Sequence, residues 1–264
     1  LLNNRINLDV SWYNQKSIGQ VLTVKVPNST GFNNLLINVG EVKNFGYEAD
    51  LKVQILRDRK IKWDASIKYS YNDNKVVSLY PGIAAFAYGG YSYATSNVVL
   101  GERFPILKTT GYFYATDGSG MRRVNATTGY PVQNTALTNR GGTLPRHMVG
   151  LGSAVTYGDV RLSFNFEYRG GNVMYSDLGG SMTFTGSGKW TENRGEQIFP
   201  NSYYIDGSGK EVPNTTVQVR QPEYALWVSN YRLIRENFVT PGWFIKLRDL
   251  NLSYSLPAAL IKKT

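Results

Sequence analysis

The sequence predicts an all-β protein, an antiparallel transmembrane β-barrel segment with about six spanning strands. Three observations predict this class: apolar and polar side chains alternate strictly over long stretches, aromatic residues and glycine are abundant, and short turns contrast with long connections. The 264 residues include 19 Tyr, 11 Phe, 5 Trp and 27 Gly. This composition favours strands joined by turns over helices.

The first hairpin is predicted over residues 45–56 and 61–72. In both stretches apolar or aromatic side chains occupy the odd positions and small or polar ones stand between them, a pattern typical of strands with one apolar face. Because the apolar residues of both strands have odd numbers, paired residue numbers should add to an even total, which excludes a two- or four-residue loop unless a bulge intervenes. The side chains predicted to face lipid near this turn are those of Val53, Ile55, Ile61 and Trp63.

A second hairpin is predicted around Gly158-Asp159. The two flanking strands carry apolar side chains at positions of opposite parity, so Tyr157 should pair with Val160 across a two-residue turn. Glycine at the first turn position favours a type II′ turn. The same register pairs Leu162 with Val155, Phe164 with Ser153 and Phe166 with Leu151, all on the lipid side.

Two more strands and three long connections complete the predicted order. One strand covers residues 6–13, and the last covers residues 243–256. In the last strand the alternation slips near Arg248-Asp249, which predicts a β-bulge there. The long connections are rich in Gly, Ser, Asn and Tyr and occupy residues 17–43, 73–145 and 170–241. Short turns on one side and long loops on the other are typical of outer-membrane barrels, whose long loops are extracellular.

Membrane helices are excluded, whereas membrane strands are not. No stretch of the sequence approaches the roughly 18 uninterrupted apolar residues that a membrane helix requires. The strands of a barrel are apolar only at alternate positions, so a mean hydropathy of −0.31 is compatible with a barrel. The smallest closed membrane barrels have about eight strands, and an open sheet edge in lipid is too costly to persist. We therefore expect residues 1–264 to be a piece of a longer polypeptide.

Composition argues against an enzyme, a metal site and a nucleic-acid-binding protein. There is no cysteine, and His147 is the single histidine, so neither a zinc centre nor a histidine-based catalytic site is expected. The net charge is +10, but the basic residues are scattered over strands and turns, so no nucleic-acid partner is expected. We expect no catalytic residue, no cofactor and no metal ligand, and the sequence identifies no substrate-binding residue.

Three segments resemble SusC-like TonB-dependent transporters. Residues 38–48 (NVGEVKNFGYE), followed by Trp63 and by residues 72–76 (NDNKV), are similar to the family pattern N-x-G-E-x-x-N-x-G-x-E … W … N-x-N-K-V. This match is the most specific of the three. Residues 4–31 look like the strand and loop that precede this motif in the family. Residues 243–257 (WFIKLRDLNLSYSLP) are similar to the family pattern (Y/F)-(I/L)-(R/K)-L-(K/R)-(N/D)-(V/L)-x-L-x-Y-x-(L)-P, with Lys246 where Arg is usual.

The resemblance implies an outer-membrane barrel of about 22 strands that is occluded by an amino-terminal plug, energised by TonB and capped by a SusD-like lipoprotein. It makes residues 1–264 the carboxy-terminal portion of the barrel, without the plug and the last strands. The implied function is uptake of an oligomeric nutrient, an oligosaccharide or a peptide, with TonB acting through the plug and outer-membrane lipid surrounding the barrel. The alternative is a secreted, soluble β-rich module that binds carbohydrate or protein and needs no detergent for extraction.

Candidate residues outside the motifs each have a plainer structural explanation. His147 is better explained as a residue at the barrel rim than as a ligand. The segments 117–120 and 206–209, both Asp-Gly-Ser-Gly, lack the alternate acidic residues of a calcium loop, so tight turns are expected. Aromatic residues of the long connections could stack on sugar rings or bind peptide side chains, or could pack within the loops. They are Tyr88, Tyr91, Tyr93, Trp190, Tyr203 and Tyr204.

The strands add two further groups of candidates, one on each face. Charged residues on the polar face should pair across strands, contact the plug or line a substrate path. They are Glu48, Asp50, Lys52, Asp64, Lys68, Arg161, Glu167 and Arg169. Aromatic residues on the apolar face fit the interfacial girdles of a membrane barrel. They are Trp12, Trp63, Tyr69, Tyr71, Tyr168 and Trp243.

Overall fold

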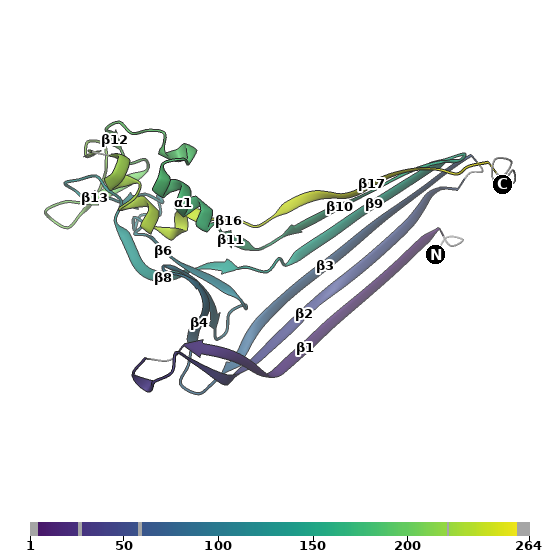
Figure 1. Cartoon of the computed structure of the whole chain (residues 1–264), viewed down its shortest axis with the longest axis horizontal. Helices are drawn as coiled ribbons and strands as arrows, with labels where there is room; N and C mark the ends of the chain where they lie inside the picture. The colour runs from purple at the N-terminus through teal and green to yellow at the C-terminus, as the bar shows by residue number, and fades with distance from the viewer. Residues whose placement is uncertain (1–4, 26–27, 58–59, 221, 258–264) are drawn as a thin grey trace.

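A six-stranded antiparallel sheet dominates the molecule (Figure 1). The structure, a computed structural model, describes residues 5–25, 28–57, 60–220 and 222–257. The strands follow the order β1-β2-β3-β9-β10-β17, and their bounds are Ile6–Lys25, Asn34–Arg57, Ile61–Leu79, His147–Tyr157, Val160–Gly170 and Phe244–Tyr254. The predicted all-β class and the six long strands are confirmed.

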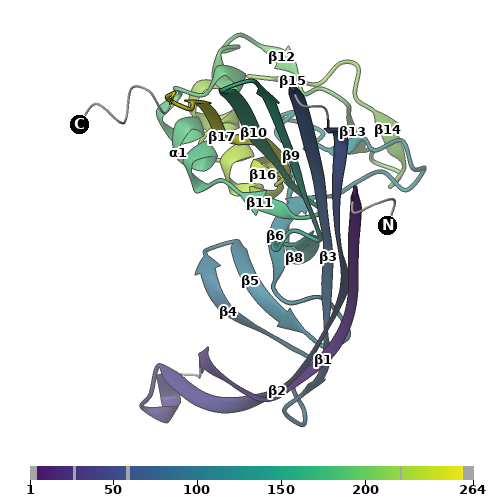
Figure 2. The ribbon, with the colours of Figure 1, turned by 90° about the vertical axis from the view of Figure 1, so that its right-hand side faces the viewer.

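Two long connections fold into a lobe at one end of this sheet (Figures 1 and 2). The first contains β4 (Ala85–Tyr91), β5 (Ala94–Val99), β6 (Ile106–Tyr112), β7 (Arg122–Arg123) and β8 (Gln133–Gly142). The second contains β11 (Val173–Tyr175), α1 (Asp177–Thr185), β12 (Gln197–Ile198), β13 (Ser202–Ile205), β14 (Glu211–Pro213), β15 (Gln218–Val219), β16 (Val239–Pro241) and short helical turns at Lys189–Thr191, Pro222–Leu226, Tyr231–Leu233 and Arg235–Phe238. Within the described residues, no helix is both long and apolar enough to cross a membrane.

The pairing registers give the large sheet one apolar and one polar face. One apolar row crosses all six strands through Leu8, Leu51, Ile67, Leu151, Phe166 and Leu247. One residue further along, the row on the opposite face is Asp9, Asp50, Lys68, Gly150, Glu167 and Lys246. The apolar face is open to its surroundings, since Leu8, Val10 and Trp12 are 53%, 64% and 71% exposed. An uncovered apolar surface of this extent suits lipid and not water.

Aromatic side chains mark both ends of the apolar face. Near the short turns lie Trp63, Tyr157 and Tyr254, and near the lobe lie Trp12, Tyr47, Tyr69, Tyr71, Tyr168 and Trp243. From Tyr157 to His147, which pairs with Tyr71, β9 extends about 33 Å at about 3.3 Å per residue, or about 25 Å in height at a tilt of about 40°. The residues predicted for the girdles therefore stand at the edges of a band as tall as the apolar band of outer-membrane barrels.

The first hairpin follows the predicted register except at its turn. From Val42↔Val76 to Gln54↔Asp64 the paired numbers add to an even total, as predicted. A bulge at Ile55 then changes the pairing to Leu56↔Trp63 and Arg57↔Lys62, with an odd total. An intervening bulge is the one exception that the register argument allowed, so the odd total at the turn does not contradict it. Leu56 takes the place predicted for Ile55 beside Trp63, because one extra residue reverses the alternation.

The second hairpin agrees with the prediction at every pair. Tyr157 pairs with Val160, and the three pairs predicted above this turn are all present. Gly158 has a φ of +56°, whereas Asp159 is not among the residues with positive φ, as a type II′ turn requires. The predicted bulge in the last strand is also present, because Asp249 pairs with Asn165 and Leu247 pairs with Phe166, leaving Arg248 as the extra residue.

The stretch 17–43 is not the long loop that was predicted. β1 continues to Lys25 and β2 begins at Asn34, so the two strands extend their hairpin well beyond the aromatic girdle. The register shifts between Ser17 and Gln20 and again before Val21, near Gly40 on the partner strand. These irregularities interrupt the two-residue alternation, which explains why the sequence pattern did not reveal the strands.

The lobe has a hydrophobic core of its own. Its buried members are Tyr112, Val124, Phe199, Val219, Leu226, Trp227 and Ile234. The predicted connections 73–145 and 170–241 are therefore folded units and not open loops. Their strands escaped prediction because some are buried on both faces: in β6 six of seven residues are buried, so no alternation remains to be recognised.

Asp73 fastens the lobe to the sheet at the end of the spanning part of β3. Its carboxylate lies 2.6 Å from Nε of Arg103 and 3.2 Å from Nε of Arg146. The Asp73 and Arg103 side chains are only 12% and 11% exposed, so water screens this ion pair weakly. Beside it, the Asn74 amide donates to the Phe104 carbonyl oxygen and accepts from the Phe104 N–H, both at 2.7 Å.

A lipid-facing side at β10 can be tested by comparing two neighbouring substitutions. Phe164 lies about 14 Å above the Gly158-Asp159 turn, near the bilayer midplane, and Ser163 faces the other side of the sheet. Phe164→Arg should cost about 2–4 kcal/mol of stability in the membrane, and Ser163→Arg should cost much less. Denaturant titration of the full-length barrel refolding into lipid measures both. Equal losses would show that this strand has no lipid-facing side.

The Asp73 ion pairs can be tested by hydrogen exchange of the full-length protein in detergent. Asp73→Asn leaves Arg103 as a buried cation without its counterion, at a cost of about 3 kcal/mol to the local attachment. We expect faster exchange at residues 101–104 and unchanged exchange in β10. Asp117→Asn, at an exposed turn, serves as the charge-matched control. Unchanged protection of residues 101–104 in Asp73→Asn would contradict the attachment.

Candidate functional site on the polar face

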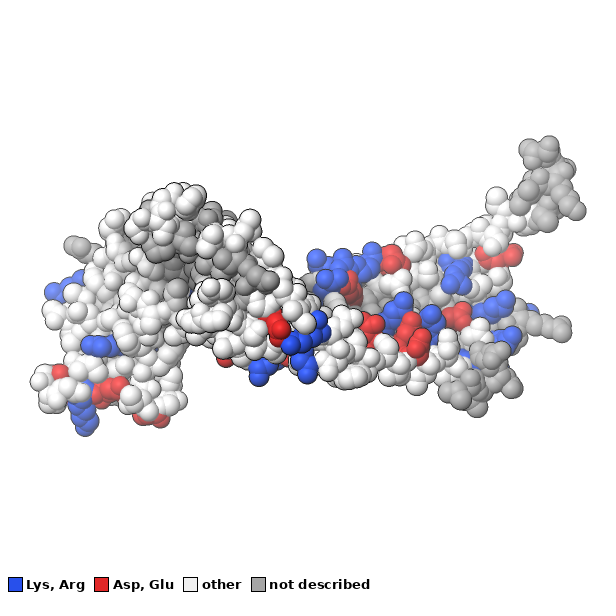
Figure 3. All heavy atoms as spheres, turned by 90° about the horizontal axis from the view of Figure 1, so that it is seen from below, with Lys and Arg blue, Asp and Glu red and all other residues white. Residues whose placement is uncertain are grey.

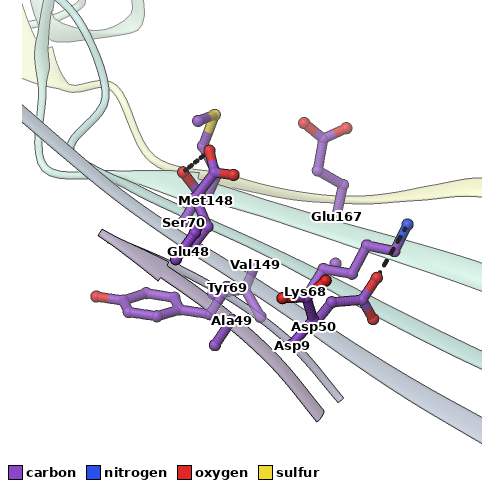
Figure 4. A pocket seen from close by; sticks show the side chains of 12 residues that line it. Asp9, Glu48, Ala49, Asp50, Lys68, Tyr69, Ser70, Met148, Val149 and Glu167 are labelled. Atoms are coloured by element: carbon purple, nitrogen blue, oxygen red, sulfur yellow. Dashed lines mark hydrogen bonds and ion pairs between the residues drawn. The ribbon is translucent and has the colours of Figure 1, made fainter. Parts of the chain in front are cut away.

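The polar face of the large sheet contains a hollow of about 550 Å³ (Figure 4). Five strands contribute its lining, which includes Asp9, Ser11, Glu48, Asp50, Lys68, Ser70, Met148 and Glu167. The strand alternation places each of these side chains on the same face. Gly150 of β9 adds no side chain there, which leaves space beside Lys68, whereas the space above Gly152 is filled by the side chains of Ser66 and Asn165.

The β1–β2 side of this hollow is rich in carboxylates. Asp9 and Asp50 are directly paired across the two strands, an arrangement in which like charges repel. Oδ2 of Asp50 lies 3.8 Å from Nζ of Lys68 and 3.6 Å from Nζ of Lys52. Both lysines are largely exposed, so these ion pairs offset the repulsion only in part. Glu48 accepts a 3.5 Å hydrogen bond from the Ser70 hydroxyl.

The β10–β17 side of the polar face is rich in cations. Glu167 forms ion pairs with Arg169 of its own strand and with Arg248 of β17. Asn165 donates hydrogen bonds of 3.0 Å to both carboxylate oxygens of Asp249. Figure 3 shows acidic and basic side chains interspersed along the spanning half of the molecule.

The structure pairs some of the predicted inward charges and leaves others apart. Among the charged residues predicted to point inward, Lys68 and Asp50 form the one cross-strand ion pair within the described residues. Arg169 and Glu167 form an ion pair along one strand. Arg161 donates a 3.5 Å hydrogen bond to the Thr156 hydroxyl. Arg248 was not predicted to point inward. Arg248 points inward because it is the extra residue of the bulge. The interrupted alternation of apolar residues in this strand was the sequence signal that could have revealed its direction.

The arrangement suits reversible polar contacts with a protein surface or a passing solute. In the part of the chain that the structure describes, no group of three or more His, Asp or Glu side chains is placed to hold a metal ion. Fixed charges of both signs in an open hollow can bind a complementary polar surface and release it, since exposed ion pairs are individually weak.

His147 lies on the apolar face, at the lobe end of β9. Its Nδ1 is 2.9 Å from the Tyr69 hydroxyl, and its ring packs on the rings of Tyr69 and Tyr71 at centroid distances of 6.2 and 5.2 Å. It belongs to the upper aromatic girdle, which agrees with the predicted position at the rim.

The candidate aromatic residues of the lobe divide into two groups. Tyr203 is 3% exposed, and Tyr204 packs against the lobe core, so both have structural positions. Tyr88, Tyr91, Tyr93 and Trp190 are exposed. The indole N–H of Trp190 donates a 2.9 Å hydrogen bond to the Thr183 hydroxyl, which fixes its orientation. These four remain available for contact with a solute or a partner.

Both Asp-Gly-Ser-Gly segments are tight turns, as predicted. Oδ1 of Asp117 accepts a hydrogen bond from the Ser119 N–H at 2.8 Å. Oδ1 of Asp206 accepts from the backbone N–H groups of Ser208 and Lys210, both at 2.9 Å. Hydrogen bonds from the Ser119 and Ser208 side chains contribute most to lowering the pKa of the two carboxyls, and the backbone hydrogen bonds lower it further.

Glu236 organises a polar network in the lobe that the sequence did not predict. Its carboxylate lies 2.9 Å from Nη2 of Arg140 and accepts hydrogen bonds from the Tyr114 hydroxyl at 2.5 Å and the Tyr112 N–H at 3.2 Å. Partial burial, and then the hydrogen bond to Glu236, raise the pKa of Tyr114 to about 12. No local signal could have revealed this network, because its members are brought together only by the folding of the two connections.

The family follows from comparison with known proteins. The family described as "TonB dependent receptor-like, beta-barrel" matches residues 1–256. The chain belongs to this family. The TonB-dependent barrel described here therefore lies in the bacterial outer membrane, and the resemblance to SusC-like transporters is confirmed, whereas a secreted soluble module is not supported.

Individual relatives of this TonB-dependent barrel segment are distant and much longer. "TonB-dependent receptor P26" of Formosa agariphila (strain DSM 15362 / KCTC 12365 / LMG 23005 / KMM 3901 / M-2Alg 35-1) is 23% identical over 97% of this chain and 26% of its own length. "TonB-dependent receptor P39" of the same strain is 27% identical over 68% of this chain and 16% of its own length. The chain thus spans about a quarter or less of these relatives.

Solved structures share the fold of this barrel segment. A structure of the "RagAB peptide transporter" superposes with a TM-score of 0.65 and 20% identity over 98% of this chain and 27% of its own. The "open-open" state of the "RagAB peptide importer" gives a TM-score of 0.61 with 19% identity over the same shares. At this identity the similarity establishes the fold of the segment.

The Tyr114–Glu236 hydrogen bond can be tested by alkaline titration. Since the folded pKa of Tyr114 is raised above the usual value of about 10, its stabilising contribution is complete below pH 10 and is lost as the pH rises through about 12. The difference in tyrosinate absorbance between the full-length protein and Tyr114→Phe should therefore have its midpoint near pH 12. A difference curve centred near pH 10 would show that the Tyr114 hydroxyl is not partly buried and hydrogen-bonded to Glu236 as described.

Proposed function

We propose that this chain forms part of the wall and the extracellular surface of a TonB-dependent transporter that takes up an oligomeric nutrient, a glycan or a peptide. The single observation that carries the proposal is the combination of a two-faced spanning sheet with a folded lobe at one end. The apolar face suits lipid, the charged face suits a hydrated lumen, and the lobe suits a position outside the cell, where such barrels keep their long loops.

The proposal includes closure of the barrel by strands outside residues 1–264. β1 and β17 are the edge strands of the sheet, and each pairs on one side only within the described residues. Backbone groups along such an edge cannot stay unpaired in hydrocarbon. Further strands must therefore complete the barrel, and about 22 strands with a plug in the lumen is the size that the family resemblance implies.

The charged hollow on the polar face supports a contact with the plug. Asp9, Glu48 and Asp50 on one side and Arg169 and Arg248 on the other offer both signs of charge to a complementary surface. Ion pairs of this exposed kind are weak and salt-sensitive, which suits a plug that must be held at rest and displaced when TonB acts.

Exposed residues of the lobe support the proposal that it contacts a partner protein and an oligomeric substrate. Tyr91 and Trp190 are exposed on it, and aromatic residues are enriched where proteins bind partners, sugars or peptides. The similarity to the RagAB peptide transporter favours peptide as one substrate class, and a glycan is equally compatible with exposed aromatic rings. A SusD-like lipoprotein on this side of the membrane is the partner that the resemblance implies.

Co-purification and uptake test the proposal together. The tagged full-length protein, extracted in mild detergent, should retain a SusD-like lipoprotein, and cells that carry it should accumulate labelled oligosaccharides or oligopeptides only when TonB is functional. An unrelated tagged outer-membrane barrel of similar abundance controls for nonspecific association. Uptake that persists without TonB, or a transport-competent barrel that never binds such a lipoprotein, would refute the proposed function.

A further inference from the structure

Three lysines form a row on the outward face of the sheet, beyond the aromatic girdle. Lys16 of β1 pairs with Lys43 of β2, and Lys43 pairs with Lys75 of β3. Each stands four positions from a girdle residue of its own strand, namely Trp12, Tyr47 and Tyr71 respectively. Because the separation is even and the register between them is unbroken, the lysines share the face of the aromatic residues.

The height of this row corresponds to the headgroup layer. Four residues extend about 13 Å along a strand, or about 10 Å above the girdle at a tilt of about 40°. The polar headgroup region of a bilayer begins where the hydrocarbon ends and adds several ångströms on each side. All three lysines are exposed, so their long side chains can lie along the sheet and place their ammonium groups among lipid headgroups.

The protein does not neutralise this row by itself. Directly opposed like charges destabilise a sheet, and here three are aligned. Within the described residues, Lys16 has an ion pair with Glu41, whereas neither Lys43 nor Lys75 has one. The nearest carboxylate further down the face, Asp73, is already held by two arginines.

The charge of the surroundings also favours an anion. Arg103 and Arg146 add two cations beside Asp73, and Glu102 lies on the segment whose backbone accepts a 2.8 Å hydrogen bond from the Val76 N–H. Five cations therefore meet three carboxylates over a patch that is continuous with the lipid-facing band. Because this face points away from the lumen and continues the lipid-facing band, an anionic lipid headgroup can reach it directly from the membrane.

We propose that Lys16, Lys43 and Lys75 bind the phosphate groups of a phosphorylated glycolipid in the outer leaflet. Several phosphates on one headgroup can bridge neighbouring lysines on adjacent strands, which relieves the repulsion between them. The apolar band below the row holds the acyl chains of the same molecule. This inference depends on the orientation of the sheet in the outer membrane and not on transport, so it stands or falls separately from the proposed function.

Native mass spectrometry of the delipidated full-length protein in detergent tests this site. The probe is diphosphorylated lipid A, compared with lipid A whose phosphates have been removed, with phosphatidylglycerol and with inorganic phosphate. Diphosphorylated lipid A should bind most tightly, and the triple variant Lys16→Gln, Lys43→Gln, Lys75→Gln should weaken its binding about tenfold or more. The triple substitution to Arg should retain binding, because it keeps the charge.

A charge-matched triple variant, Lys62→Gln, Lys189→Gln, Lys210→Gln, provides the control, since these exposed lysines lie outside the row. Heat-modifiable migration on gels reports folding, and the Gln row variant should fold at least as well as the parent because it relieves the repulsion. Equal weakening in both triples, equal binding of dephosphorylated lipid A, or full competition by inorganic phosphate would overturn the proposal. Loss of a bound lipoprotein with lipid binding unchanged would likewise overturn it and would assign the row to a protein contact.

Discussion

The spanning half of the molecule depends on one constraint: in hydrocarbon every backbone N–H and C=O must find a partner within the protein. A sheet satisfies this requirement only where neighbouring strands remain in register across the membrane. Once the register is set, the pleat sends successive side chains to opposite faces. The apolar row from Leu8 to Leu247 and the charged row from Asp9 to Lys246 are therefore two results of the same hydrogen-bond ladder.

A β-bulge adds one residue to one strand of this ladder, so the side chains beyond it alternate between the faces in the opposite order. The bulge at Ile55 lies next to the turn, where it exchanges Leu56 for Ile55 at the edge of the apolar band. The bulge at Arg248 lies within the band. It keeps both Leu247 and Leu250 on the lipid side while it directs a guanidinium toward Glu167. One extra residue thus adds a cross-strand ion pair to the polar face at no loss of apolar surface.

The sequence predicts those parts of the fold that obey a short period and fails where tertiary packing replaces the period. The hairpin around Gly158 could be predicted pair by pair, because alternation and turn chemistry agree there. The extension of β1 to Lys25 was hidden by irregularities that interrupt the alternation. The lobe was hidden more completely, because strands such as β6 are buried on both sides and their partners lie far away in sequence.

The same division, between what a short sequence period predicts and what tertiary packing decides, applies to the charged site on the polar face. Alternation correctly assigned Asp50, Lys68 and Glu167 to one face, since it requires only the parity of their positions. Alternation could not predict which of these charged residues form ion pairs, because ion pairing depends on the register of the strands and on the bulge at Arg248. The contacts of Glu236 with Tyr114 and Arg140 are beyond any local pattern, as they join the two connections that build the lobe.

The attachment through Asp73 divides the molecule into a lobe whose sequence can vary and a spanning wall whose sequence cannot. The lobe core, which includes Val124 and Ile234, shares no residue with the rows of the spanning sheet, and the ion pairs with Arg103 and Arg146 touch the wall only where β3 leaves the girdle. Loops carried on a rigid scaffold tolerate change far better than the scaffold does. Recombination within the two connections can therefore give descendants of this protein a new recognition surface while they inherit the wall unaltered.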